Sequence, residues 1–173
     1  MIRMTSAFAN KVLRKLSEDK IFWLNKESEG CTYVAAVDEE PVIPEYDYAD
    51  VASKIDDIDA KVVKIKHALN VTNATSKVSV NGVEMTIDEI LVRMAQLHRR
   101  KAVLDNMRKE EPKRRISYGL YSSRKTAPEY KYINYDLDLI KSEYERIDTE
   151  ISSMQLALDK YNQTFEFDVD INL

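Results

Sequence analysis

The chain has 173 residues, a formal net charge of −4, and 32% charged residues against only three glycines. This length suits one domain with a modest core, and the composition favours helices over turn-rich β folds. A single cysteine excludes an intrachain disulfide and a cysteine metal cluster, and the common glycine-containing phosphate and nucleophile motifs are missing from the sequence. No stretch approaches the roughly 20 apolar residues of a membrane span, and the N-terminus lacks a signal-peptide core, so we expect a soluble cytoplasmic protein of bacterial type.

The charge is unevenly distributed along the sequence. Between Arg93 and Lys131 there are twelve basic and four acidic residues, a net of +8, which leaves −12 for the rest of the chain. Asp38–Asp59 alone holds nine acidic residues against one basic residue. This asymmetry indicates either an anionic partner or contacts between acidic and basic regions within or between subunits.

The first predicted element is a helix over Met4–Trp23, inside an N-terminal helical segment that we assign to residues 1–30. Apolar side chains recur at i, i+4 and i+8 from Phe8, which is the spacing of one helix face. Thr5 or Ser6 can cap the start, because a hydroxyl there can accept a hydrogen bond from a free amide of the first turn.

An acidic linker, residues 31–47, leads to a second predicted helix over Tyr48–Asn73. Pro41 and Pro44 keep the linker extended, since the residue before a proline avoids the α region. The apolar residues of the helix alternate steps of four and three, a heptad seam typical of coiled coils. The seam consists of Val51, Ile55, Ile58, Val62, Ile65 and Leu69.

We predict that Asn70 and Asn73 close the second helix. Asparagine tolerates the left-handed geometry that ends many helices. Both residues, and Asn162 further on, begin Asn-x-Thr triplets, but without a secretory signal these triplets do not indicate glycosylation. Asn70 and Asn73 are therefore candidates for a hydrogen-bonded structural turn near Asn162.

An Asn-Gly pair after the second helix predicts a short β-hairpin, with Lys77–Val80 paired against Val83–Met85. A third helix should then begin, because Thr86 and Glu89 have the spacing of a capping box. We expect it to end near Glu111, since a proline follows.

A second insert, Lys113–Tyr135, alternates on both sides of a polar loop and predicts a longer β-hairpin. It contains five tyrosines, Tyr118, Tyr121, Tyr130, Tyr132 and Tyr135. Cations that contact phosphates, together with rings that stack on bases, describe a nucleic-acid surface. The candidate anion or nucleic-acid surface consists of Arg99, Arg100, Lys113, Arg114, Arg115, Arg124 and Lys125. The alternative, which the acidic net charge favours, is that the tyrosines form sheet core or a subunit interface and the cations pair with Asp38–Asp59 of a neighbour.

The last predicted helix, Asp136–Gln163, carries the most regular seam, over about eight turns and roughly 40 Å. We assign this seam to the core or to an oligomer interface. Its members are Leu137, Ile140, Tyr144, Ile147, Ile151, Met154, Leu158 and Tyr161. Residues 164–173 alternate between apolar and polar and should form a strand or an extended arm.

Together these elements predict a single, mainly α domain over residues 1–173. It is an antiparallel bundle of long, coiled-coil-like helices with two small β-hairpin inserts, and residues 48–163 form a helix–hairpin–helix–hairpin–helix unit. In this bundle the seams of Val51–Leu69 and Ile87–Leu104 cover the seam of the last helix. A thin bundle buries less apolar surface than a globule of equal mass, so we expect a homo-oligomer.

Three stretches resemble the septicolysin-like family of small bacterial helical proteins. They are Leu69-Asn70-Val71-Thr72-Asn73, Thr86–Leu97, and Leu158-Asp159-Lys160-Tyr161-Asn162-Gln163-Thr164, within an order of elements that is similar from about Phe8 onward. The chain departs from the family at Val71, where a basic residue is usual, and it lacks a tryptophan beside Asn162. The resemblance implies a helical oligomer without an established activity, with a hexamer as one arrangement.

The titratable side chains form no recognisable catalytic or metal-binding pattern. Arg99 and Arg100 follow His98 and would repel a metal, His67 lies two residues from a seam position, and Cys31 has no nearby base. Six carboxylates could be imagined as a metal site, but they avoid the seams and no Glu-x-x-His motif accompanies them. These six are Asp56, Asp57, Asp59, Glu143, Glu145 and Glu150. We assign no catalytic residue, metal ligand or cofactor.

The leading hypothesis is a non-enzymatic, homo-oligomeric helical-bundle protein that acts through interaction surfaces. Nucleic-acid binding through the Arg99–Lys125 region is the alternative. Long helices bearing β-hairpins also resemble prefoldin-type holdases, which adds a chaperone hypothesis by fold analogy. The family name adds a membrane-active toxin, although no strand pair here is long and apolar enough to favour it.

Overall fold

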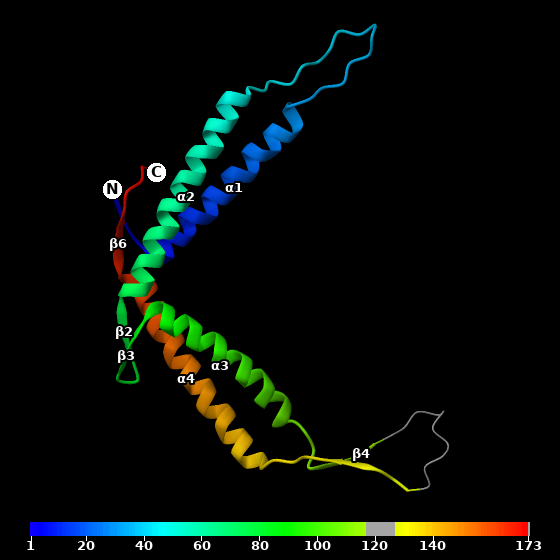
Figure 1. Cartoon of the computed structure of the whole chain (residues 1–173), viewed down its shortest axis with the longest axis vertical. Coiled ribbons are helices and arrows are strands. Elements are labelled where there is room, and N and C mark those ends of the chain that lie inside the picture. The colour runs from blue at the N-terminus through cyan, green and yellow to red at the C-terminus, as the bar shows by residue number, and fades with distance from the viewer. Residues whose placement is uncertain (117–126, 173) are drawn as a thin grey trace. The chain divides into compact units, whose positions relative to one another are not determined.

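The computed structural model describes residues 1–116 and 127–172, and it confirms a mainly helical fold with small antiparallel two-stranded sheets (Figure 1). The chain divides into two compact units: unit 1 comprises Met1–Val78 and Leu158–Leu173, and unit 2 comprises Ser79–Ala157. The assignment of the chain to a single domain stays a prediction. In chain order the elements are β1 (Ile2–Thr5), α1 (Ser6–Gly30), α2 (Tyr48–Thr75), β2 (Lys77–Val80), β3 (Val83–Thr86), α3 (Ile87–Met107), β4 (Lys113–Arg115), β5 (Tyr130–Tyr132), α4 (Leu137–Thr164) and β6 (Glu166–Val169).

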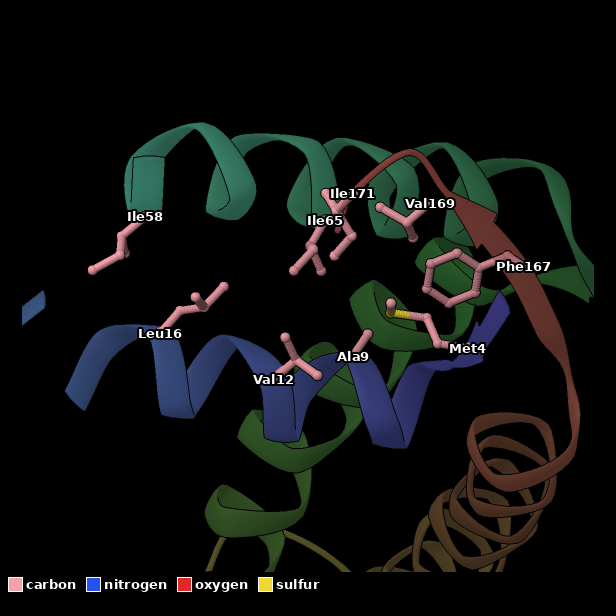
Figure 2. Packing of buried hydrophobic residues seen from close by; sticks show 9 residues of the cluster. All are labelled: Met4, Ala9, Val12, Leu16, Ile58, Ile65, Phe167, Val169 and Ile171. Carbon is pink, nitrogen blue, oxygen red and sulfur yellow. The ribbon is translucent and has the colours of Figure 1, made fainter. Parts of the chain in front are cut away.

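Unit 1 is built on α1 and α2, which lie side by side (Figure 1). Figure 2 shows side chains of both helices pointing into the space between them, with Val12 and Leu16 on one side and Ile58 and Ile65 on the other. Ala9 and Ile65 have no exposed surface. Complete burial of an aliphatic side chain of this size stabilises a fold by about 1.5–3 kcal/mol. These contacts therefore hold the two helices together.

The two ends of the chain meet in an antiparallel sheet in which Met4 lies opposite Phe167 and Ile2 opposite Val169. The side chains of Met4, Phe167 and Val169 enter the same core (Figure 2). The predicted strand in the tail is thus confirmed. The start of the first helix at Met4 was wrong, because pairing with β6 holds Met4 and Thr5 in an extended conformation.

Local contacts at its two ends explain where α1 begins and where it stops. The N-cap prediction is confirmed for Thr5, whose Oγ1 accepts a hydrogen bond of 3.2 Å from the Phe8 amide. The helix continues past the predicted end at Trp23 to Gly30. A side chain at Gly30 would clash, since an added Cβ would lie 2.8 Å from Tyr46 Cβ. The return of the linker over Gly30 therefore requires a glycine there.

The partner of α2 differs from the prediction. The predicted partner of the Val51–Leu69 seam is the last helix, whereas the structure packs α2 on α1. The seam itself is confirmed as core, because Val51, Ile58 and Ile65 are buried. A heptad pattern shows which face of a helix is apolar, and it does not identify the helix that covers this face.

The predicted turn at Asn70 and Asn73 is wrong, because both residues lie inside α2, which continues to Thr75. The helix ends at Ser76, whose backbone is extended (φ −77°, ψ 132°) and whose amide donates to the Thr72 carbonyl. The chain passes directly into β2 and needs no left-handed residue at this point. Asn162 likewise lies inside a helix, α4.

The β2–β3 hairpin is confirmed, with positive φ angles of 51° at Asn81 and 83° at Gly82. These angles are those of a two-residue turn that matches the twist of paired strands. The capping box at the start of α3 is also confirmed, since Glu89 bonds back to the Thr86 amide at 2.8 Å. The first β-hairpin and the helix start thus follow directly from local sequence.

Unit 2 is built on α3 and α4, which also lie side by side (Figure 1). Ile87, Ile90 and Leu104 of α3 are almost fully buried. The helix ends at Met107, before the predicted Glu111. The amides of Lys109 and Glu110 bond to carbonyls three residues back, so the chain tightens into turns there.

The seam of the last helix is confirmed as core. Ile140, Ile147, Ile151, Met154, Leu158 and Tyr161 are buried, and Leu137 and Tyr144 are half-buried. Oligomer contacts through the same seam stay a prediction. Because these side chains are already covered within one chain, a subunit interface would need other surfaces.

Candidate functional site

The described part of the second insert is a two-stranded antiparallel ribbon made of β4 and β5. Lys113 pairs with Tyr132, Arg114 with Lys131, and Arg115 with Tyr130. Side chains that lie opposite each other share a face, and successive residues alternate between faces. One face of this basic ribbon (Lys113–Arg115 with Tyr130–Tyr132) therefore presents two cations and two tyrosines, and the other presents Arg114 and Lys131.

The ribbon is open to solvent on both faces, since all six of its residues are exposed. Tyr132 keeps 61% of its surface exposed and Tyr130 keeps 39%. A two-stranded ribbon without a core gains little from packing. The ribbon must therefore be stabilised by its cross-strand contacts and by its contacts with the rest of unit 2.

Cation–π contacts organise the aromatic face. The ammonium of Lys113 lies 4.3 Å from the centre of the Tyr130 ring and 5.5 Å from that of Tyr132. The two rings are tilted by 51° with their centres 6.4 Å apart. Lys113 thus stabilises the two rings in a defined arrangement while leaving much of Tyr132 exposed.

Two hydrogen bonds connect the ribbon and the residues just after it to the end of α3 and the turn that follows. The Tyr135 hydroxyl donates to the Met107 carbonyl at 2.7 Å, and Lys131 donates to Glu110 at 2.9 Å. The Ile133 amide donates to the Pro112 carbonyl at 3.3 Å and so continues the pairing of the two strands. The ion pair with Lys131 lowers the pKa of Glu110, so the carboxylate stays charged and neutralises Lys131.

Much of the basic region of α3 is already neutralised within unit 2. Arg93 pairs with Glu150 at 2.9 Å and Lys101 with Asp148 at 2.5 Å, both across to α4. Arg108 and Lys109 pair with Asp105, and these hydrogen bonds lower the pKa of the Asp105 carboxyl. These cations stabilise the helix pair, and the sequence could not separate them from cations available to a partner.

Five of the predicted cations have no ion-pair partner within the described residues: Arg99, Arg100, Lys113, Arg114 and Arg115. Arg99 and Arg100 are exposed on α3, and the other three belong to the ribbon. Arg124 and Lys125 lie outside the described residues, as do Tyr118 and Tyr121. The ribbon therefore supplies the part of the candidate surface that combines free cations with exposed rings.

The half-buried Tyr144 shows a different use of aromatic and basic groups. The Arg108 guanidinium lies 3.9 Å from its ring centre, and Lys101 lies 5.2 Å from it. Here the cations cover the Tyr144 ring, a half-buried member of the α4 seam. Arginine and lysine stems can cover apolar surface in this way.

The other sequence candidates are exposed or belong to ion pairs. His67 and His98 are exposed, and so is Cys31, whose thiol lies 3.6 Å from the Ser28 carbonyl. Asp59 pairs with Lys20, Glu143 with Arg146, and Glu150 with Arg93 and Arg146. Asp56, Asp57 and Glu145 are exposed.

Residues 1–116 and 127–172 also bear on metal binding and on membrane insertion. In this part of the chain, no three His, Cys, Asp or Glu side chains gather as metal ligands would. None of the helices described there combines the length and the apolar character that crossing a bilayer requires.

No protein-family model matches the chain, and no curated protein matches it. Among solved structures it is similar to the crystal structure of a functionally unknown conserved protein from Corynebacterium diphtheriae. The TM-score is 0.62 over 96% of this chain and 100% of that one, with 11% sequence identity. At this identity the likeness shows a shared fold.

Proposed function

We propose that this protein is a non-enzymatic, self-associating helical-bundle protein of the cytoplasm that acts through interaction surfaces. The observation that carries the proposal is the exposure of large apolar side chains near the end of α1. Ile21 is 55% exposed, Phe22 61% and Leu24 42%, within four residues of one another. A cluster of this kind is a common mark of a protein interface.

The architecture of unit 1 explains this exposure. Two helices packed side by side cover one face of each other and leave the outer faces open. The sheet of β1 and β6 covers the start of α1, where Met4 and Ala9 are buried, but the end of α1 has no such cover. Packing against a second copy would remove these side chains from water. This would stabilise the pair by about 25 cal/mol for each Å² of apolar surface buried.

Solution mass tests this proposal. One chain weighs 20.1 kDa, so light scattering on a sizing column separates monomer from oligomer. The double variant Ile21→Ser and Phe22→Ser should weaken association, while Val92→Ser, at an exposed apolar position of α3, should leave it unchanged. A wild-type chain that remains monomeric at tens of micromolar would refute self-association.

The sole tryptophan offers a second readout of the same event. Trp23 is half-buried, and its ring meets Phe22 edge-on with centres 5.3 Å apart. Its emission should shift to longer wavelength on dilution, as the neighbouring apolar residues become hydrated. If the Trp23 emission stays constant while dilution lowers the mass of the oligomer, the interface lies elsewhere.

A second candidate function is binding of single-stranded nucleic acid by the basic ribbon. The specific observation is that Lys113, Arg115, Tyr130 and Tyr132 share one exposed face. Such a face can contact phosphates with its cations and stack bases on its rings.

Salt dependence tests the ribbon candidate. The logarithm of the affinity for a labelled single strand should fall linearly with the logarithm of the salt concentration, and Tyr132→Ala should weaken binding. Tyr33→Ala removes a tyrosine of comparable exposure, 52%, from the linker and serves as the control. Undetectable binding at low salt would eliminate this candidate.

A further inference from the structure

A groove on unit 1 combines an apolar floor with a basic rim. Phe8, Val12 and Leu16 of α1 form the floor, and the volume is about 410 Å³. Lys11 and Lys15 of α1 and Lys61 of α2 also line it, with Asp19 as the one acidic member. This lysine groove therefore carries two net positive charges beside exposed apolar surface.

The lysines of the groove are available for a partner. Neighbouring cations on α1 are neutralised, Arg14 by Glu18 at 3.1 Å and Lys20 by Asp59 at 2.6 Å. Within the part of the chain that the structure describes, Lys11, Lys15 and Lys61 have no carboxylate at ion-pair distance. An anionic ligand with apolar groups matches both features of this groove.

The linker between α1 and α2 has that chemistry. Val37 and Val42 are almost completely exposed and Ile43 is 63% exposed. Between and around them stand four acidic residues, Asp38, Glu39, Glu40 and Glu45. In this acidic loop (residues 37–45) the Glu39 amide donates to the Ala36 carbonyl at 3.3 Å and closes a turn, and Pro41 and Pro44 restrict the residues that follow. Such restriction lowers the entropy lost when the loop docks.

The loop does not cover the groove of its own chain. Residues 31–40 are all exposed, and the chain returns over Gly30, where Tyr46 packs closely. The loop leaves unit 1 at the ends of α1 and α2, beyond the helix segment that holds the groove (Figure 1). Nine residues from Gly30 to Glu39 can span about 30 Å when extended. They can therefore reach a groove on a neighbouring molecule.

We propose that the acidic loop of one copy docks in the lysine groove of a second copy. The inference rests on the proposed self-association and adds the two surfaces that meet. Each copy carries one loop and one groove, so a two-fold pair forms the loop–groove contact twice. Valine and isoleucine side chains cover the floor at Phe8, and the loop carboxylates meet the three lysines.

Charge reversal on each side tests the contact. The loop variant combines Glu39→Lys with Glu40→Lys, and the groove variant combines Lys11→Glu with Lys15→Glu. Each should weaken self-association at least about tenfold, because like charges then face each other. The control, Lys54→Glu with Lys66→Glu on α2, changes the net charge as the groove variant does and should retain the wild-type dissociation constant. Urea midpoints of all variants should stay close to that of the wild type, since the altered residues are exposed.

Mixing the two defective variants gives the decisive measurement. The basic loop of the loop variant is complementary to the acidic groove of the groove variant. The unchanged acidic loop of the groove variant is complementary to the unchanged basic groove of the loop variant. The mixture should therefore form a mixed oligomer in sedimentation velocity, with a dissociation constant within about threefold of the wild-type value.

The outcomes separate this inference from the proposed function. A wild-type chain that self-associates while the variants keep its dissociation constant overturns the docking and leaves self-association standing. Loss of association in the groove variant alone shows that the groove contacts a part of the second copy other than the acidic loop, and it also overturns the docking. A monomeric wild type overturns both.

Discussion

The two units join their helices by different means. In unit 1 the contacts between α1 and α2 are mainly apolar, closed at one end by β1 and β6, and Lys20–Asp59 is an isolated ion pair between the helices. In unit 2 a buried seam is flanked by ion pairs from α3 to α4 through Arg93 and Lys101, and cations cover the Tyr144 ring. Exposed apolar side chains occur in both units, but α1 of unit 1 gathers Ile21, Phe22 and Leu24 within four residues, whereas unit 2 carries the basic ribbon with its exposed rings. We connect the first with self-association and the second with an anionic partner.

The tail should have the largest effect on unit 1. Deleting residues 166–172 removes β6 and three buried side chains, Phe167, Val169 and Ile171. At about 1.5–3 kcal/mol each, their loss is a large part of the 5–15 kcal/mol that stabilises a typical domain. Hydrogen exchange should accelerate in α1 and α2 much more than in α3. Equal acceleration in the two units would show that they unfold together.

A single cavity in the apolar core should have the next largest effect. Ile65→Ala, at a position with no exposed surface, should lower the free energy of unfolding by about 2–5 kcal/mol in urea denaturation. Val63→Ala provides the matched control two residues away on α2, where the side chain is 66% exposed. It should change the free energy by less than about 0.5 kcal/mol. Similar losses in both variants would contradict the placement of the core.

The ion pair between α3 and α4 should contribute less than the core. A double-mutant cycle on Arg93 and Glu150 should give about 0.2–1 kcal/mol of coupling, decreasing as salt is added. The Arg14–Glu18 pair within α1 is more exposed, at 84% and 63%, and provides a comparison from unit 1. Its coupling should be about 0.3–0.5 kcal/mol or less. Equal coupling for the two pairs would remove this difference between the units.

Lowering the pH should have the smallest of these effects, and it should decrease the stability of unit 2. Hydrogen bonds from Lys109 lower the pKa of Asp105, those from Lys131 lower that of Glu110, and those from Arg146 lower that of Glu143. Their stabilisation is present above the ordinary carboxyl values of about 3.9–4.3 and is lost as pH falls through the lowered folded values. Carboxyl NMR titrations should give midpoints for these three residues below the ordinary values of their residue types. Midpoints at the ordinary values would contradict the prediction.

Local sequence was sufficient for several elements. The Asn81-Gly82 turn, the capping box of Thr86 and Glu89, and the seam of α4 depend on neighbours within about one or two turns of chain. The basic ribbon was also foreseen through Lys113, Arg114 and Arg115. The lysine groove was missed, although Lys11 and Lys15 next to Phe8 and Val12 give the i, i+4 spacing that places them on one side of α1.

Contacts between distant segments required the tertiary structure. The pairing of β1 with β6 joins residues at opposite ends of the chain, and the choice of α1 as the partner of α2 depends on which apolar faces fit. Asn70 and Asn73 are helical because α2 leads directly into β2, which overrides their preference for helix ends. Free and neutralised cations likewise look alike in sequence. Helices, their apolar faces and the first hairpin turn could be predicted from the sequence, because backbone propensity and side-chain period are local. The partner of each face and the charges left exposed depend on residues far apart in the chain, so they could be seen only in the folded molecule.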